Sequence, residues 1–289
     1  MAILKAKLTS TELVTSYLGI FTFRPNERIP FLPGQYVTLG VSREGLRGEA
    51  KNPKHVRNID SKETVLRALS IASPPEEEDI ELFIVWVQRD GKRKDEKGLL
   101  STELFQPRRD LEYLFLSNKA KGRFLLPEDS RDVIMVATGT GLAPYLSMLK
   151  SDEINHGNRR YVLIHGVSCH SDLAYREELT DLTRVRNLTY LHTCSREECD
   201  DCQTTYAEEL FLNREEGKKR RVTIEEVEKA VRQGRINDTG IENIIGRETR
   251  PERTIIMLCG NPAMIDNIKL IAEAKNFQVG EDIVTEEYW

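Results

Sequence analysis

The chain has 289 residues, of which 39% are hydrophobic and 31% charged, and its formal net charge is -5 at pH 7. This length accommodates two medium-sized domains, each with a buried core. The acidic balance argues against general nucleic-acid binding, which basic domains carry. No apolar run approaches the ~18 residues of a membrane span, and the first seven residues lack the features of a secretory signal. We therefore expect a cytoplasmic monomer without a membrane span or a nucleic-acid partner.

Short apolar or alternating runs, broken by Pro, Gly and charged residues, dominate the N-terminal part of the chain. They lie at residues 3–8, 13–23, 36–41, 80–88 and 111–116. Closely spaced strands without long helices predict an antiparallel β-barrel.

From about residue 132 the pattern changes to compact buried strands that alternate with helical stretches. The strand candidates are residues 133–137, 161–165, 188–191 and 254–258, and the helical stretches include 143–150 and 171–183. This alternation predicts a parallel, Rossmann-like sheet. The expected fold class is β + α/β, with an antiparallel barrel domain at 1–128 followed by an α/β domain at 129–289. Residues 42–62 and 213–250 form long charged segments that we interpret as insertions.

The cysteines all lie in the second half of the chain, at Cys169, Cys194, Cys199, Cys202 and Cys259. A cytoplasmic chain of this size keeps its thiols reduced, so no disulfide framework is predicted. The Cys194-x4-Cys199-x2-Cys202 spacing matches the first three ligands of a plant-type [2Fe-2S] loop, but Cys259 belongs to another motif and supplies no fourth ligand. We predict no metal, and the metal-binding alternative stays open.

Short motifs are distributed along most of the chain. Gly139-Thr140-Gly141-Leu142-Ala143-Pro144 follows a predicted buried strand and opens a helix, which is the context of a nicotinamide-binding loop. Glycines let the backbone approach a ligand, and Pro144 fits the first turn of a helix. Cys259-Gly260-Asn261-Pro262 follows the last predicted buried strand, where α/β sheets bind ligands. Two further motifs are Arg67-Ala68-Leu69-Ser70 and Glu286-Glu287-Tyr288-Trp289.

Together with Phe31-Leu32-Pro33-Gly34-Gln35-Tyr36, these motifs resemble the ferredoxin-NADP reductases, specifically the bacterial type that ends in Tyr-Trp. The resemblance covers nearly the whole chain. It implies that the barrel binds FAD and the second domain binds NADP(H). It also implies an enzyme that exchanges a hydride with NADP(H) and single electrons with ferredoxin or flavodoxin.

For FAD, the resemblance implies that Arg67 binds the pyrophosphate, Leu69 packs on the isoalloxazine and Ser70 lies near flavin N5. The planar guanidinium matches phosphate oxygens, and a hydroxyl can donate to or accept from N5. Leu69 replaces the aromatic residue of the family, so ring stacking is lost there. The second pyrophosphate contact is the turn before a predicted short helix at 102–105, namely Gly98, Leu99, Leu100, Ser101 and Thr102.

For NADP(H), the resemblance implies contacts from both loops of the second domain and from Ser195 and Arg196, which would bind the 2'-phosphate. Arg220 or Arg221 would supply a second cation. Ser168 stands where bacterial relatives have another Arg, and acidic residues follow Arg196. The implied contacts on the two loops are Thr138, Gly139, Thr140, Gly141 and Pro144, and Cys259, Gly260, Asn261 and Pro262.

The implied catalytic set is Ser70, Cys259, Glu286 and Tyr288. Cys259 would align the nicotinamide, and Glu286 would take part in proton and electron transfer. Tyr288 would cover the flavin and Trp289 would pack on the FAD adenine.

Two other interpretations remain. One is a NADH-dependent flavin reductase that serves a haem protein or an oxygenase. The other is an electron-transfer subunit of a larger complex, with a metal bound through Cys194, Cys199 and Cys202. Basic clusters at 43–57 and 92–97 are candidate docking sites for an acidic ferredoxin or flavodoxin.

Overall fold

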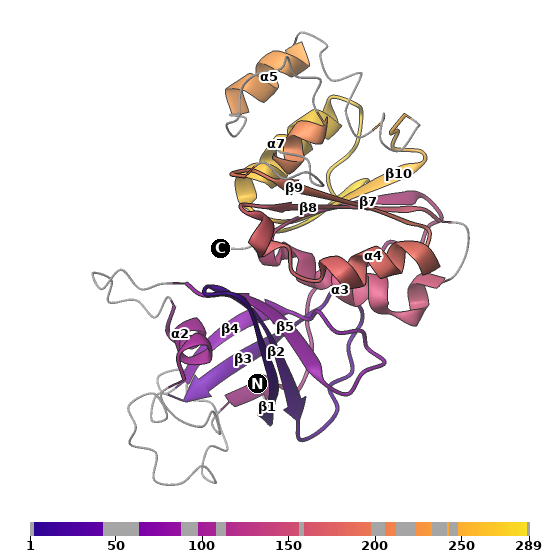
Figure 1. Ribbon diagram of the computed structural model, residues 1–289. Helices are drawn as coiled ribbons and strands as arrows, with labels where there is room; N and C mark the ends of the chain where they lie inside the picture. Colours follow the sequence, from indigo (N-terminus) through magenta and orange to yellow (C-terminus); the bar gives the residue numbers. More distant parts are fainter. Residues whose placement is uncertain are drawn as a thin grey trace. The chain divides into compact units, whose positions relative to one another are not determined.

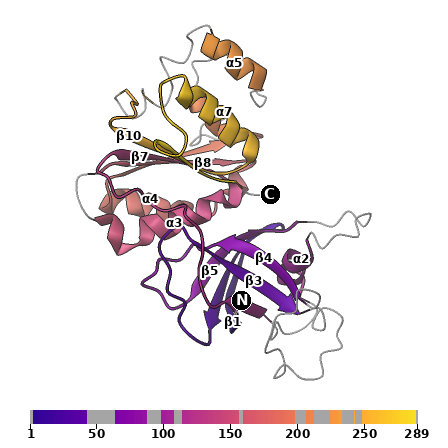
Figure 2. The same ribbon diagram turned by 180° about the vertical axis from the view of Figure 1, so that it is seen from behind.

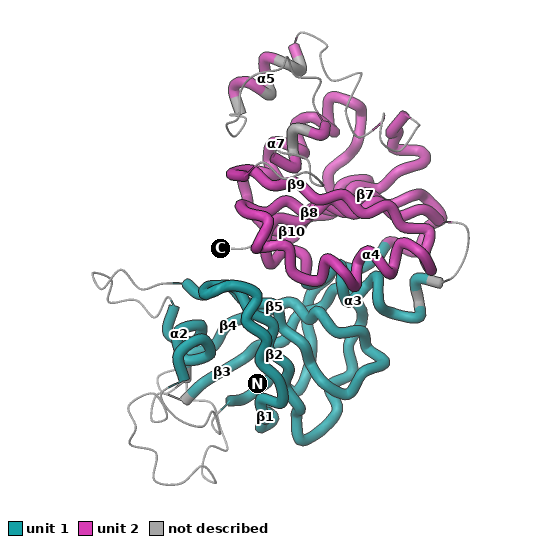
Figure 3. Tube along the Cα trace, in the orientation of Figure 1, with its two compact units in different colours: residues 1–126, 143–154 teal, residues 127–142, 155–289 magenta. Residues whose placement is uncertain are grey.

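The computed structural model describes residues 3–42, 64–87, 98–107, 114–155, 159–197, 206–211, 224–232, 242 and 248–287. The chain forms two compact units (Figure 3). The first comprises Met1–Leu126 and Ala143–Ile154, and the second comprises Pro127–Leu142 and Asn155–Trp289. Among the described residues, no helix is long and apolar enough to cross a membrane.

The first unit contains an antiparallel six-stranded sheet in the order β4-β3-β6-β1-β2-β5. Its two edge strands approach each other, because Ile71 and Leu82 form a bridge and the Ala72 N–H donates to the Glu81 carbonyl at 2.8 Å. The sheet is therefore a nearly closed barrel, which confirms the predicted architecture. Its strands are β1 (Ile3–Thr15), β2 (Leu18–Pro25), β3 (Tyr36–Ser42), β4 (Thr64–Ser70), β5 (Ile80–Val85) and β6 (Leu114–Ser117).

The first hairpin differs from the sequence prediction of strands at 3–8 and 13–23. Strand β1 continues to Thr15, which pairs with Leu18 at the start of β2. The apolar residue Leu13 therefore belongs to β1, where it is 53% exposed. Single exposed leucines are common on strands. The prediction took Leu13 as the start of the second strand because it is apolar, and this start is wrong.

Helix α2 (Leu99–Phe105) packs against the barrel. The Phe105 ring lies 5.2 Å from the Phe21 ring and 6.0 Å from the Trp86 ring, and Leu100 and Leu104 are buried. The predicted start at Thr102 is wrong. The chain enters the helix at Gly98 with φ +82°, a conformation in which glycine carries no steric penalty.

Helix α3 (Ala143–Lys150) also belongs to the first unit and matches its predicted range. Its Tyr145 ring lies 5.6 Å from the ring of Phe124. Gly34, at φ +95°, provides clearance, because a Cβ there would lie 2.4 Å from the Met148 methyl and 2.0 Å from the Phe124 carbonyl oxygen. At the end of the helix, Glu76 accepts from the Ser151 hydroxyl at 3.2 Å.

The second unit is built on a five-stranded parallel sheet in the order β11-β10-β7-β8-β9, which confirms the predicted Rossmann-like class. The strand order reverses between β7 and β10, so this pair is the topological switch point of the sheet. The strands are β7 (Asp132–Thr138), β8 (Tyr161–Val167), β9 (Leu188–Cys194), β10 (Thr254–Gly260) and β11 (Ile283–Glu287). The sequence prediction missed β11 and took β10 for the last strand.

Helices cover the two faces of this sheet (Figures 1 and 2). Helix α7 (Pro262–Glu273) and the short η5 helix (Ala207–Phe211) lie on one face and share its apolar core. Helix α4 (Arg176–Val185) lies on the other face, after the short η4 turn (His170–Asp172). The prediction of one helix at 171–183 began too early. Helix α5 (Ile224–Arg232) packs near α7, and a further short helix, η3 (Asp152–Asn155), follows α3.

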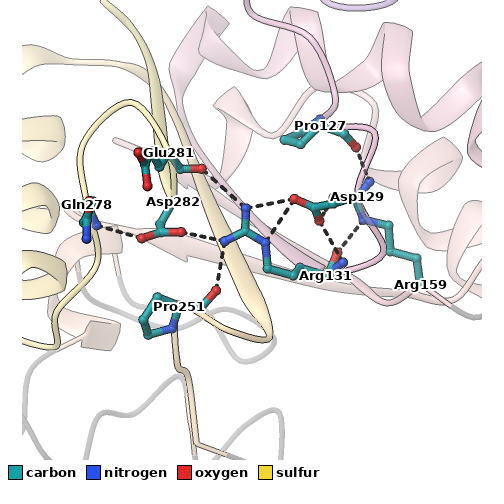
Figure 4. Close-up of polar contacts among 8 residues, drawn as sticks. All are labelled: Pro127, Asp129, Arg131, Arg159, Pro251, Gln278, Glu281 and Asp282. Atoms are coloured by element: carbon teal, nitrogen blue, oxygen red, sulfur yellow. Dashed lines mark hydrogen bonds and ion pairs between the residues drawn. The ribbon is translucent and has the colours of Figure 1, made fainter.

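Arg131 clamps the amino ends of the sheet strands (Figure 4). Its guanidinium donates to the Asp282 carboxylate at 2.5 Å and to the Asp129 carboxylate at 2.8 Å, and to the Pro251 carbonyl at 2.9 Å. The Arg131 carbonyl accepts in turn from Arg159 at 2.5 Å. One guanidinium thereby connects the segments that enter β7, β10 and β11, and Arg159 adds the segment that enters β8.

We expect Arg131→Met to lower the free energy of unfolding by about 2–4 kcal/mol, because it leaves the largely buried Asp282 carboxylate without its cation. Urea denaturation measures this change. Arg184→Met is the matched control, since the Arg184–Asp181 pair is about 70% exposed and contributes less than about 0.5 kcal/mol. An equal loss of unfolding free energy in the two variants would contradict the stabilising role of Arg131.

Candidate functional site at the sheet switch point

The carboxyl ends of β7 and β10 lie side by side. Cys259 pairs in register with Ala137, and the strands then end at Gly260 and Thr138. The Asn261 N–H donates to the Thr138 hydroxyl at 2.7 Å. The two predicted loops, which begin at Gly139 and Asn261, are therefore held together at their first residues.

Two glycines permit this close approach. A Cβ at Gly141 would lie 2.5 Å from the Cys259 carbonyl oxygen, and a Cβ at Gly260 would lie 2.3 Å from the Thr138 hydroxyl oxygen. Gly260 also has φ +125°, which an L side chain rarely adopts. Gly139 differs, because at φ +53° it has open space beside it. At Gly141 and Gly260 the two loops are thus in direct backbone contact, and we call this junction the backbone cradle.

Helix α7 begins within this cradle. The Asn261 side chain accepts from the Ala263 N–H at 3.0 Å, and Pro262 occupies the first turn, where its missing N–H costs nothing. The N–H groups of Met264 and Ile265 donate to the Asn261 carbonyl, so the helix dipole is the feature of this end that favours an anionic ligand. The predicted Cys259–Pro262 motif thus joins a strand end to a capped helix start.

Cys259 is fully buried on β10, and its neighbour in register on β11 is the partly buried Glu286. The structure therefore brings together two of the predicted catalytic residues. On the β7 side, Gly139–Leu142 forms a short 3-10 turn (η2) that leads into Pro144 in α3.

His165 is a site residue that the sequence analysis missed. It is fully buried on β8, and its Nε2 lies 3.2 Å from the carbonyl oxygen of Gly139. Burial lowers its pKa to about 4, with a smaller contribution from neighbouring His192, so the ring is neutral at pH 7. A histidine inside an apolar strand has no distinctive sequence signal, because the contact with Gly139 exists only in the folded sheet.

Ser195 and Arg196 extend the pairing of β8 with β9. The Ser195 N–H and hydroxyl donate to the Val167 carbonyl at 3.0 and 3.2 Å, and the Arg196 N–H donates to the Ser168 carbonyl at 2.9 Å. The Arg196 side chain is exposed at this edge. Both residues therefore lie at the carboxyl end of the sheet, directly after β9, as predicted.

In the barrel, Arg67 and Leu69 share one side of β4, and Ser70 lies on the other. Leu69 packs against the barrel core, and Ser70 is buried opposite Tyr36 of β3. The Arg67 guanidinium is partly buried and donates to the Leu66 carbonyl at 2.7 Å. All three residues thus belong to one described strand.

The predicted second pyrophosphate turn is occupied in part by structural hydrogen bonds. The Ser101 hydroxyl accepts from the Val87 N–H at 3.1 Å, and the Thr102 hydroxyl accepts from the Trp86 indole at 3.0 Å. These side chains fix α2 to the end of β5. The backbone N–H groups of the first helical turn, from Leu99 onward, are the groups suited to a phosphate.

Comparison with known proteins identifies relatives. Residues 135–224 match the oxidoreductase NAD-binding domain family. A ferredoxin-NADP reductase of Azotobacter vinelandii is 29% identical over 86% of this chain and 81% of that protein. A flavodoxin/ferredoxin-NADP reductase of Buchnera aphidicola is 27% identical over 90% of this chain and 88% of that protein. The chain is a homologue of the ferredoxin-NADP reductases. It is an oxidoreductase of this type.

Solved structures share the same two-part fold. A ferredoxin-NADP reductase from Neisseria gonorrhoeae, with bound FAD and NADP, superposes with a TM-score of 0.73 at 21% identity and covers 100% of both chains. The flavohem-like FAD/NAD-binding domain of a Vibrio cholerae nitric oxide dioxygenase gives a TM-score of 0.67 at 14% identity, covering 100% of this chain and 99% of that one. The reductase fold is therefore common to proteins with different electron partners.

Several predicted residues of this ferredoxin-NADP reductase homologue lie outside the described residues. They are Arg220, Arg221, Tyr288 and Trp289, the cysteines Cys199 and Cys202, most of the two predicted insertions, and the basic clusters at 43–57 and 92–97. Among the described residues, Cys169, Cys194 and Cys259 form no disulfide. Within the described ranges, no three His, Cys, Asp or Glu side chains gather in a way that would hold a metal ion.

We expect Gly141→Ala to destabilise the protein by about 2–4 kcal/mol, because the added methyl group forces β10 away from the loop. Gly139→Ala is the matched control. It meets no atom within 4 Å and carries only the penalty of a positive φ, roughly 1 kcal/mol. Urea denaturation of both variants measures the difference, and equal losses would contradict the close approach.

His165 should make folding stability depend on pH. The pKa is about 4 in the folded protein and 6.5 for an unperturbed histidine, so the unfolded chain binds the proton more readily. The associated stability is present above pH 6.5 and is lost as the pH falls towards 4. Between pH 7 and pH 5 the wild type should lose about 2 kcal/mol more than His165→Gln, which cannot titrate. Denaturation curves at the two pH values check this, and parallel losses would contradict it.

Proposed function

We propose that this oxidoreductase binds FAD on its barrel and NADP(H) at the switch point. It moves a hydride between them and exchanges single electrons with ferredoxin or flavodoxin. The observation that carries the proposal is the contact of two glycine-containing loops at the carboxyl ends of β7 and β10, the switch point where α/β sheets bind ligands. The homology to reductases named for ferredoxin, flavodoxin and NADP supports the choice of partners.

The barrel residues suit a flavin dinucleotide. Arg67 would bind the pyrophosphate with its planar donor fork, assisted by the N–H groups of Leu99 and Leu100 at the start of α2. Ser70 would hold a hydrogen bond at flavin N5. Leu69 and Trp289 would contact the ring systems, and Tyr288 would shield the flavin until nicotinamide enters. When bound, FAD supplies the exchange between two-electron and one-electron chemistry.

The switch-point residues suit a nicotinamide dinucleotide. The Gly139–Gly141 backbone would hold phosphate groups through its N–H groups, because glycine places no side chain in the way. The dipole at the start of α7 would favour the same negative charge. Cys259 would position the nicotinamide, since hydride transfer requires reacting carbons at roughly 3–3.5 Å. Glu286, its register neighbour, would exchange protons with solvent.

Arg196 would select NADP(H) through the 2'-phosphate, with Ser195, and Arg220 or Arg221 would add a second cation. The acidic neighbour Glu197 does not contradict this choice. Its carboxylate accepts from the His170 N–H at 2.8 Å, a bond that lowers its pKa and gives it a structural role.

An anaerobic absorbance titration tests the function. The purified protein should be yellow, and NADPH should bleach it at lower concentration than NADH. Addition of oxidised ferredoxin or flavodoxin should then restore the flavin spectrum. A colourless protein, or one that neither nucleotide bleaches, would overturn the proposal. We also propose a cytoplasmic monomer, which cell fractionation and analytical ultracentrifugation test.

A NADH-dependent reductase of a haem protein is the second candidate. It is favoured by the fold shared with the Vibrio cholerae domain and by Ser168, which places a small hydroxyl where the resemblance implies a second arginine. Bleaching by NADH alone, without a response to NADPH, would select this candidate.

We expect Arg196→Ala to raise the KM for NADPH by roughly 10- to 100-fold, the effect of losing a charge-assisted hydrogen bond. The KM for NADH should change less than about twofold, because NADH has no 2'-phosphate. Steady-state kinetics with a soluble electron acceptor measures both values. A similar rise for the two nucleotides would contradict the role of Arg196.

A further inference from the structure

His165 contacts the Gly139–Thr140 peptide group of the loop that follows β7. Its Nε2 lies 3.2 Å from the Gly139 carbonyl oxygen, and the residue is fully buried on β8, which lies between β7 and β9. Because the contact reaches a carbonyl, Nε2 must carry the proton and donate. Nδ1 has no hydrogen-bond partner among the described residues, so this bond alone fixes the tautomer.

The geometry of the peptide bond extends the effect of this contact. In a trans peptide, the carbonyl of one residue and the N–H of the next point in opposite directions. The described residues contain no cis peptide. When His165 binds the Gly139 carbonyl, the Thr140 N–H is therefore directed away from the buried ring. The orientation of one carbonyl sets the orientation of a main-chain donor in the loop.

The chain gives this orientation limited local support. Gly139 has φ +53° and no side chain of its own to restrict the backbone. The η2 turn contains only four residues, and 3-10 hydrogen bonds have poorer geometry than α-helical ones. The bond from His165 therefore adds to the few contacts that hold the Gly139–Thr140 peptide.

We propose that His165 is a positioning residue for nucleotide binding, which holds the Gly139–Thr140 peptide so that the Thr140 N–H faces the dinucleotide phosphates. This inference rests on the proposed function, since it assigns the donor that shapes the same loop. His165 does not touch the nucleotide. It contributes by removing the conformations of the loop in which the carbonyl would meet the phosphate.

The histidine at the neighbouring register position provides a matched comparison. His192 of β9 pairs with His165 in the sheet, and neither of its ring nitrogens has a hydrogen-bond partner among the described residues. It lies beside His165 in the sheet, is partly buried rather than fully buried, and lacks the contact with the loop. If loss of packing in the sheet weakens NADP+ binding, substitution of either histidine should weaken it. If positioning of the loop is responsible, only substitution of His165 should weaken it.

The test compares His165→Leu, which removes the donor, with His165→Gln, whose amide retains one, and with His192→Leu. The dissociation constant of NADP+ is measured by difference absorbance on the FAD-loaded protein, together with kcat and the KM for NADPH. His165→Leu should weaken NADP+ binding roughly 5- to 10-fold and raise KM with a smaller change in kcat. His165→Gln should stay within about threefold of the wild type, and His192→Leu should match the wild type.

Three results would overturn the inference. The His165→Leu and His165→Gln variants could weaken NADP+ binding equally, His192→Leu could weaken it as much as His165→Leu, or all three variants could bind NADP+ like the wild type. If His165→Leu does not fold, as judged by thermal melting, His165→Met replaces it as the variant without a donor. The proposed function fails separately, because a wild-type protein that binds neither NADP+ nor NADPH would overturn the function before any variant is compared.

Discussion

The parallel pairing of β7 with β10 is the constraint on which the rest of the second unit depends. Strand order reverses at this pair, so the chain continues from the two strand ends in opposite directions across the sheet. The backbones approach so closely that residues 141 and 260 must be glycine. The bond from Asn261 to Thr138 then joins the two loops. A single packing requirement thereby fixes both the strand junction and the position of the two loops.

The Arg131 hydrogen-bond network and the proposed binding site lie at opposite edges of the same sheet. At the amino edge, Arg131 satisfies two carboxylates and two carbonyls, which fixes the strand entries with charge-assisted bonds. At the carboxyl edge, the connections rely on glycine, on one hydroxyl and on the short η2 turn. A rigid edge allows the other edge to present main-chain groups to a ligand without unravelling the strands.

The elements that could be predicted from the sequence are those with a clear pattern in their own residues. Continuous apolar runs located β7, β8 and β10, because strands buried on both faces need apolar side chains at every position. The start of α2 and strand β11 escaped prediction for different reasons. Gly98 begins the helix through a left-handed conformation, and β11 is only partly buried and rich in acidic residues. His165 could not be assigned from sequence, since its role arises from a contact between residues 26 positions apart. The roles of Arg67, Ser70 and Arg196 stay predictions.

A histidine is well suited to the position beneath the loop. A lysine or arginine buried there would need a counter-ion, which the register neighbours Ala137 on β7 and His192 on β9 do not supply. An aliphatic side chain would fill the space but provide no donor. Imidazole is a rigid donor that burial keeps neutral, because its pKa falls to about 4. The neutral imidazole therefore donates one ring N–H to the Gly139 carbonyl without placing an unpaired charge inside the apolar sheet.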